Sequence, residues 1–230
     1  MKSQIKILTI IVLLLSCQNQ EANTSASTGA NLKGKEFSYS EVVLYDNFRN
    51  TLEPDTSTTP SFTQFSPLYI GKLCDSIKLT YKPGKIKSRT LDDGKYKSPG
   101  PEDIEVFIDT SKTIGFSMHF LDYEYKSEYR TAIKSYPVFI KNKTIDTLNI
   151  GFGDFLPLLT ETEDSNGKWS VYERPFIYDC GTGITSLILP PNQIAITALR
   201  QKTAQEGANV RVKFETRKGD IHSNSVRFNF

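Results

Sequence analysis

Histidine, cysteine and tryptophan are scarce in this chain of 230 residues, which has two His, three Cys and one Trp. So few imidazoles and thiols exclude a His-rich metal cage, a domain with several zinc ions and a disulfide-dense scaffold. An excess of charge of one sign is missing too, since 28 Lys and Arg stand against 26 Asp and Glu. The composition therefore gives no support to functions that need a strongly basic or acidic surface, and nucleic-acid binding is the first of these.

The N-terminus has the order of a secretory signal, in which basic residues precede an apolar stretch and a small residue. Lys2 and Lys6 come before the apolar run of residues 7–15. That run is far shorter than the ~20 residues of a membrane-spanning helix. We predict a signal peptide over residues 1–16, whose removal takes away two Lys and no acidic residue. The mature chain then has 28 − 2 = 26 basic and 26 acidic residues and is neutral.

The pair Ser16-Cys17 resembles the lipobox of bacterial lipoproteins. In that family the Cys thiol receives a diacylglycerol, cleavage occurs before the Cys, and the new amine is acylated, for example by palmitate. The resemblance implies that Cys17 is the lipidated N-terminus; the alternative is a plain signal peptide with an incidental Cys. Two or three acyl chains make a stable anchor, whereas a single chain binds membranes only reversibly. Gln18 stands where some bacteria use Asp for inner-membrane retention, which favours the outer membrane and leaves its periplasmic or surface face open.

The composition changes after the lipidation site. Residues 17–36 are mostly small and polar, as in a flexible tether. All 14 Phe, 11 Tyr and the single Trp lie from Phe37 onward. We therefore expect the folded region to span residues 37–230.

Apolar and polar residues alternate with a period of two through most of this region, and no stretch sustains a helical period. The fold class that this predicts is all-β, an immunoglobulin-like antiparallel β-sandwich. A boundary near residues 130–135 would divide it into two small β subdomains, and a single sandwich is equally compatible. The expected strands are Asp75–Tyr81, Ile104–Ile108, Thr113–Phe120, Tyr136–Lys141, Leu148–Phe152, Lys168–Tyr172, Thr185–Leu189, Gln193–Leu199, Asn209–Glu215 and Ser223–Phe230.

A series of short motifs runs from residue 69 to the C-terminal strand. The motifs are Tyr69-Ile70-Gly71-Lys72, Asp75-Ser76-Ile77, Tyr136-Pro137-Val138 with Asn142, Trp169 with Glu173, Cys180-Gly181, Leu189-Pro190, Gly207 with Arg211, and Ser223-Asn224. In order and spacing they resemble an uncharacterised family of β-sandwich lipoproteins from Bacteroidota-type bacteria. The resemblance implies a β-sandwich held to the cell envelope by lipid, and it implies no activity.

Known catalytic patterns are missing. Ser117 follows one Gly but lacks the second Gly of a nucleophile elbow, and His222 lies in a turn where an exposed His is common. We therefore expect no catalytic residue and no enzymatic activity. The alternative is a glycan-acting hydrolase with paired carboxylates, which pair in space rather than in sequence. Its candidate residues are Glu161, Glu173 and Asp179, with His119 and His222 as the available imidazoles.

One acidic turn invites a metal hypothesis. Glu161, Glu163, Asp164 and Asn166 precede Gly167 and could bind Ca²⁺ through oxygen atoms. A working Ca²⁺ loop has more carboxylates at fixed alternate positions, so a hairpin turn capped by polar side chains is favoured. Phosphate-binding and dinucleotide-binding loops are missing as well. We expect neither a metal nor a cofactor.

Aromatic residues suggest a binding surface. Tyr123 and Tyr125 would share a strand face and could stack on sugar rings, and Trp169 is a third candidate; packing in the core is the favoured alternative for all three. Cys74 and Cys180 could form a disulfide outside the cytosol, although two unpaired, buried thiols are favoured. The predicted function is a lipid-anchored binding or accessory module of the cell envelope. Its predicted partners are the membrane, through the lipid, and an envelope protein or glycan, but no nucleic acid.

Overall fold

The fold is described from a computed structural model, in residues 38–46, 52, 65–80, 88–90, 95–117, 132–173, 185–202 and 206–228. Within these ranges strands dominate, the one helical element is the short 3-10 turn η1 (Tyr39–Glu41), and there is no α-helix. The protein is all-β with a sandwich-like fold, which confirms the fold class predicted from the period of two. None of the described segments forms a helix with the length and apolarity needed to cross a membrane. Residues 36–230 form one compact unit.

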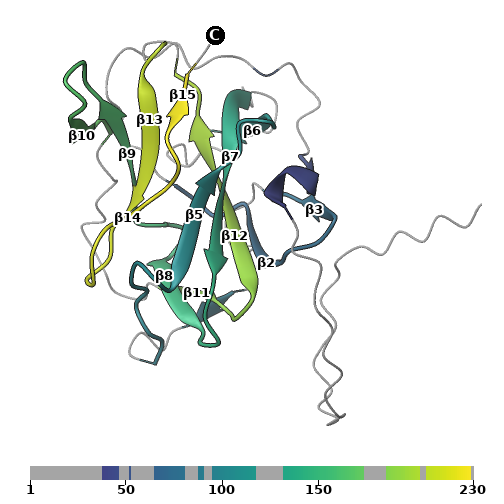
Figure 1. The fold of residues 1–230 in the computed structure, drawn as a ribbon. Coiled ribbons are helices and arrows are strands. Elements are labelled where there is room, and N and C mark those ends of the chain that lie inside the picture. The colour runs from purple at the N-terminus through teal and green to yellow at the C-terminus, as the bar shows by residue number, and fades with distance from the viewer. Residues whose placement is uncertain are drawn as a thin grey trace, which may run out of the picture. The chain divides into compact units, whose positions relative to one another are not determined.

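A central sheet has the strand order β2-β12-β7-β5, and β6 also pairs with β7 (Figure 1). Strand β7 is 11 residues long, which lets it pair with β6 along its first half and with β5 along its second. Since β7 begins within residues 130–135 and pairs with strands from both sides of that segment, no boundary between sheets lies there. The strands of this sheet are β2 (Tyr69–Lys72), β5 (Ile104–Ile108), β6 (Ile114–Ser117), β7 (Ala132–Asn142) and β12 (Gln193–Arg200).

Three further sheets surround the central one. The first has the order β10-β9-β13-β14 with β15 also on β13, and the second has the order β4-β11-β8. In the third, β1 and β3 pair in parallel, whereas the other strand pairs described are antiparallel as predicted. These strands are β1 (Val43–Tyr45), β3 (Ser76–Lys78), β4 (Arg89–Thr90), β8 (Leu148–Phe152), β9 (Leu158–Glu163), β10 (Trp169–Val171), β11 (Ser186–Leu189), β13 (Asn209–Phe214), β14 (Ile221–His222) and β15 (Val226–Arg227).

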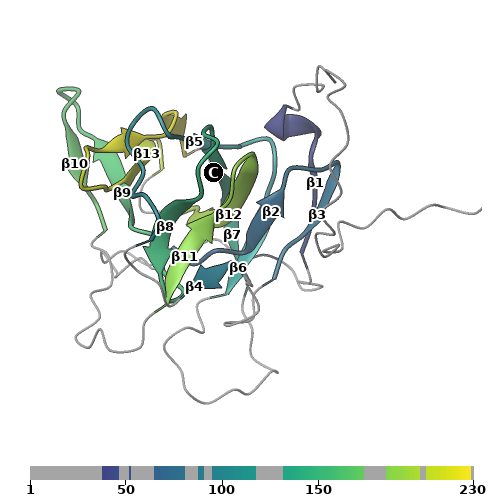
Figure 2. The same ribbon diagram turned by 90° about the horizontal axis from the view of Figure 1, so that it is seen from below.

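Both faces of the central sheet are covered. Figure 2 shows β1 and β3 on one side of it and β9, β10 and β13 on the other. Alternation along β7 sends Val138 and Ile140 into one apolar cluster and Phe139 into a second. Strand β12 is buried at every position from Ile194 to Arg200, as expected for a central strand with two covered faces.

A side chain closes one edge of the central sheet. Asn224, in the loop between β14 and β15, accepts a hydrogen bond from the backbone N–H of Ile108 at 2.7 Å and donates one to its carbonyl at 3.0 Å. These are the two bonds that a neighbouring strand would make to this residue. The amide therefore protects the β5 edge at Ile108 from pairing with another chain.

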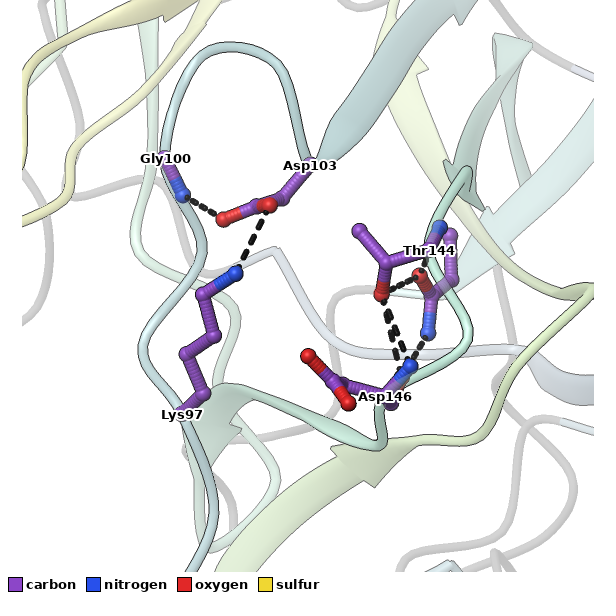
Figure 3. A network of polar contacts seen from close by, with 6 residues as sticks. Lys97, Gly100, Asp103, Thr144 and Asp146 are labelled. Carbon is purple, nitrogen blue, oxygen red and sulfur yellow. Dashed lines mark hydrogen bonds and ion pairs between the residues drawn. The ribbon is translucent and has the colours of Figure 1, made fainter.

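The turn between β7 and β8 is held by Asn142. Its side-chain nitrogen donates to the carbonyls of Asp146 at 2.7 Å and Leu189 at 2.9 Å. Its side-chain oxygen accepts from the backbone N–H and the hydroxyl of Thr144, both at 2.8 Å (Figure 3). A single buried amide thus satisfies four bonds and gives the turn one conformation.

A second polar network lies beside this turn, in the loop before β5. The Nζ of Lys97 is 2.9 Å from one carboxylate oxygen of Asp103, and the N–H of Gly100 donates to the other at 2.8 Å (Figure 3). The hydrogen bond from Lys97 is the main cause that lowers the pKa of Asp103, and the bond from Gly100 adds to it. The carbonyl of Asp103 in turn accepts from the N–H of Lys143, which joins the two loops.

Candidate functional site

Charged and aromatic side chains gather on one face of the sheet β10-β9-β13-β14. Successive residues of a strand point to opposite faces, so Val210 enters the core while Arg211 and Lys213 point away from it. In the ladder Arg211 lies opposite Glu161 on β9, and Lys213 lies opposite His222 on β14. We call this surface the outer face and define it by Trp169, Glu161, Arg211, Lys213 and His222.

Glu161 is the centre of the outer face, and its side chain is only 9% exposed. The Nε of Arg211 donates to Oε2 at 2.7 Å, and the Nε2 of His222 lies 3.5 Å from the same oxygen. The Nζ of Lys213 is 4.0 Å from Oε1. Three nitrogen-bearing side chains therefore surround this carboxylate and offset the cost of its burial.

The guanidinium of Arg211 also stacks on the indole of Trp169, with Cζ 4.2 Å from the ring centroid. Such a cation–π contact contributes about 0.5–1 kcal/mol at an exposed site. Glu161 binds the same guanidinium, so the ion pair between Glu161 and Arg211 also helps to fix the position of the Trp169 ring. Trp169 belongs to neither core cluster and is partly exposed, so the favoured expectation that it packs in the core is wrong.

Lys213 is the second cation of the outer face. Its Nζ lies 3.0 Å from Oε1 of Glu215 and 3.5 Å from Oδ2 of Asp220. Burial acts to lower the pKa of Lys213, but the hydrogen bond to Glu215 and the charges of Glu215, Asp220 and Glu161 outweigh burial and raise it. The ammonium group is therefore charged and engaged within the face.

The acidic turn next to this face closes on itself. The Oδ1 of Asp164 accepts from the backbone N–H of Asn166 and of Lys168, both at 2.9 Å, and Gly167 has a φ of 78°. Glu163 accepts from the side chain of Asn209 at 2.8 Å. The favoured interpretation, a hairpin turn capped by polar side chains, is confirmed. In the part of the chain that the structure describes, no cluster of three or more His, Cys, Asp or Glu side chains could hold a metal ion.

Glu173 lies on the other side of β9 from the outer face. Its Oε2 is 3.4 Å from the hydroxyl of Thr160, the inward-pointing neighbour of Glu161. The Nη2 of Arg200 donates to Oε1 at 3.0 Å, and the Nζ of Lys202 is 2.5 Å from the same oxygen. Glu161 and Glu173 therefore share no cleft, which a pair of catalytic carboxylates would need.

Several predicted site residues lie outside the described residues, and the hypotheses that depend on them stay predictions. They are Cys17, Tyr123, Tyr125 and Cys180 among the predicted lipidation, ligand and disulfide residues, and His119 and Asp179 in the hydrolase alternative.

Cys74 is disulfide-bonded. The favoured expectation of two unpaired thiols is therefore wrong for Cys74. Cys180 remains its predicted partner, since Cys17 is predicted to carry lipid.

The sequence alone does not identify the cations that pair with Glu161 and Glu173. Arg211 and Lys213 are spaced as outward residues of a strand, and that alternation with Val210 and Val212 was the available signal. Their carboxylate partner is distant in the chain, so only the register of β9 against β13 identifies it. Arg200 ends the apolar strand β12 and Lys202 follows it, while their partner Glu173 lies 27 residues before Arg200, so no local pattern suggests a buried pair.

Comparison of the chain with models of protein families, with curated proteins and with solved structures gives no match.

Proposed function

We propose that the mature chain is a lipid-anchored protein of the bacterial cell envelope that binds a glycan through the outer face and catalyses no reaction. The observation that carries the glycan-binding part is the stack of Arg211 on Trp169, with Arg211 held by Glu161. An aromatic ring that is held in place before a ligand arrives loses little entropy on binding. Sugar rings present C–H groups that pack against such a ring.

The pairing of charges on the outer face favours a ligand without charge, because each cation of the face already has a carboxylate partner. Arg211 is paired with Glu161, and Lys213 is paired with Glu215 and Asp220. A ligand with its own charge would have to displace one of these partners. A neutral sugar needs only hydrogen bonds at the rim, which the exposed side chain of Asn209 and the ring of His222, 35% exposed, can make.

The positions of the carboxylates support a binding role over hydrolysis. Both oxygens of Glu161 already face cationic or imidazole nitrogens, at 2.7 to 4.0 Å. Glu173 is buried on the other side of β9 with Arg200 and Lys202. Neither carboxylate is presented to a substrate as a general acid or nucleophile.

The lipid anchor is proposed from the sequence. Lys2 and Lys6, the apolar run of residues 7–15 and the pair Ser16-Cys17 stand in the order that lipoprotein signals require. Metabolic labelling with an alkyne fatty acid should mark the wild-type chain and leave Cys17→Ser unmarked. A mature protein whose intact mass equals that of residues 17–230 without acyl groups would instead indicate a plain signal peptide.

Glycan binding is tested with the purified mature chain in detergent, first on an array of neutral oligosaccharides and then by calorimetry with the sugars that bind. Trp169→Ala should weaken binding by roughly tenfold, because one aromatic stacking contact is worth about 1.4 kcal/mol. Arg211→Lys keeps the charge but loses the planar stack, so it should weaken binding in the same direction.

The matched control is Tyr45→Ala, which removes an aromatic ring that is 57% exposed on β1, in a different sheet. It should leave the affinity unchanged. If Trp169→Ala binds sugars as the wild type does, or if no neutral oligosaccharide binds, the outer face is not a glycan site.

A further inference from the structure

Strand β10 is an edge strand of its sheet. Among the described residues it pairs with β9 alone, and no other strand pairs with its outer side. Tyr172 donates its N–H to the carbonyl of Thr160, so by alternation Ser170 also directs its backbone groups to β9. The N–H and C=O groups of Trp169 and Val171 point the other way, and among the described residues nothing pairs with them.

This edge differs from the edge of β5, where the amide of Asn224 occupies the backbone groups of Ile108. In the ranges that the structure describes, no side chain caps the edge of β10 in this way. Its side chains are accessible as well, since Ser170 is exposed and Val171 is 42% exposed. Proteins usually cover, charge or twist such an edge, because it is a template for pairing with another strand.

We propose that β10 pairs with β10 of a second copy of this chain, antiparallel and about a two-fold axis through Ser170. In that register Trp169 of each copy lies opposite Val171 of the other. Pairs of an aromatic and a β-branched residue are among the stabilising cross-strand pairs, and the symmetry makes this one twice. The outward N–H and C=O groups of Trp169 meet those of Val171 in the hydrogen-bonded positions of the ladder.

The self-complementarity of the strand is what selects a second copy over another extended segment. The order apolar, polar, apolar in Trp169-Ser170-Val171 reads the same in both directions about its centre. Because the axis is perpendicular to the sheet, the two outer faces point the same way and form one continuous surface. Two Trp169–Arg211 stacks would then lie on one face, which suits a repeating ligand such as a glycan chain.

A three-residue strand buries less than the roughly 1,000 Å² of a stable interface in solution. Confinement to a membrane raises the effective concentration of the two copies, so a small contact suffices there. In this respect alone the inference rests on the proposed lipid anchor.

Ser170→Cys tests the register directly. On the two-fold axis residue 170 of each copy forms a non-hydrogen-bonded pair, with Cα atoms about 4.5 Å apart. A disulfide spans Cα distances of about 4.4–6.8 Å, so the two introduced thiols can join. The full-length Ser170→Cys chain is expressed in bacteria with its signal, and envelope fractions are run on a non-reducing gel. The chain should appear there as a disulfide-linked dimer. The wild-type chain should give none.

The matched control is Ser165→Cys, a Ser that is also exposed and lies in the turn of the same hairpin but away from the edge. It should stay monomeric. Adding Val171→Pro to Ser170→Cys should abolish the dimer, because it removes an N–H that β9 does not use. Val171→Asp is a second disruptive variant, because it keeps the backbone N–H but places a carboxylate, which disfavours strands, opposite the indole of Trp169 of the other copy.

Equal cross-linking of Ser170→Cys and Ser165→Cys would indicate random collision and overturn the proposal. So would a monomeric Ser170→Cys chain that carries the fatty-acid label, and that result would leave the lipid anchor and the glycan site untouched. Loss of the dimer in both Val171 variants supports the proposed register, and its persistence in a folded variant would refute it.

Discussion

The buried ion cluster of Glu173 offers the sharpest test of the fold's energetics. Glu173, Arg200 and Lys202 have side chains that are 3%, 4% and 2% exposed, and both cations meet the same carboxylate oxygen. The Nζ of Lys202 makes no hydrogen bond of good geometry, so its pairing with Glu173 is ionic. Glu173→Gln keeps the size of the side chain and removes only the charge.

We expect this substitution to lower the free energy of unfolding by about 3–5 kcal/mol, the usual cost of removing one partner from a buried ion pair. The cost is electrostatic rather than steric, because Gln leaves no cavity. For a domain of this size each kcal/mol shifts the melting temperature by about 2–4 °C, so the shift should be roughly 6–20 °C.

Urea unfolding followed by the fluorescence of Trp169, the only tryptophan, measures the change. Glu163→Gln is the control, because its carboxylate hydrogen-bonds to Asn209 at an exposed site and its loss should cost no more than about 0.5 kcal/mol. Adding Lys202→Met to Glu173→Gln should recover part of the stability, since it removes an uncompensated buried charge. A Glu173→Gln chain within about 1 kcal/mol of the wild type would refute this reasoning.

Three other outcomes are expected from the same unfolding assay. Asn224→Ala should cost about 1–3 kcal/mol, because the N–H and C=O of Ile108 lose their partner; an unchanged midpoint would argue against the capping role. The pKa of Asp103 is lowered by Lys97, so its contribution is complete above the ordinary carboxyl pKa and is lost as the pH falls through the folded-state value. The stability difference between wild type and Asp103→Asn should therefore be present at pH 7 and shrink toward pH 2, and a constant difference would contradict the assignment. Reduction of the Cys74 disulfide should lower the free energy of unfolding by about 4.7 kcal/mol if the bond closes a loop of about 100 residues, and peptide mapping without reductant identifies the partner.

Strands with clear alternation and turn residues on both sides were predictable from sequence. Strands β5 and β8 occupy the same residues as predicted, 104–108 and 148–152. Strand β9 (Leu158–Glu163) is not predicted by alternation of apolar and polar residues, because both of its faces are polar after the two Leu: Thr on the inward face and Glu on the outward one. Glu161 is nevertheless buried, in an ion pair with Arg211. The predicted strand over residues 223–230 is interrupted, because Asn224 leaves the sheet to cap β5.

The outer face was predictable only in its parts. The sequence points to Glu161 and His222 for the hydrolase alternative and to Trp169 for ligand binding, and nothing in it joins the three into one site. Strand β13 brings them together, because it lies between β9 and β14 and contributes Arg211 to both the carboxylate and the indole. A register between strands so distant in the chain follows from tertiary packing and has no local sequence signal.

The double covering of the central sheet has a consequence for how the protein unfolds. Strand β7 supplies Val138 and Ile140 to one cluster and Phe139 to the other, and β12 does the same with Ala195 and Ile196. If one cluster unfolds, β7 and β12 lose their places in the sheet, and the other cluster loses the side chains that these two strands supply to it. The two therefore lose structure in a single cooperative step, and the slowest-exchanging backbone amides should be those of the shared strands, β7 and β12, rather than those of the outer layers.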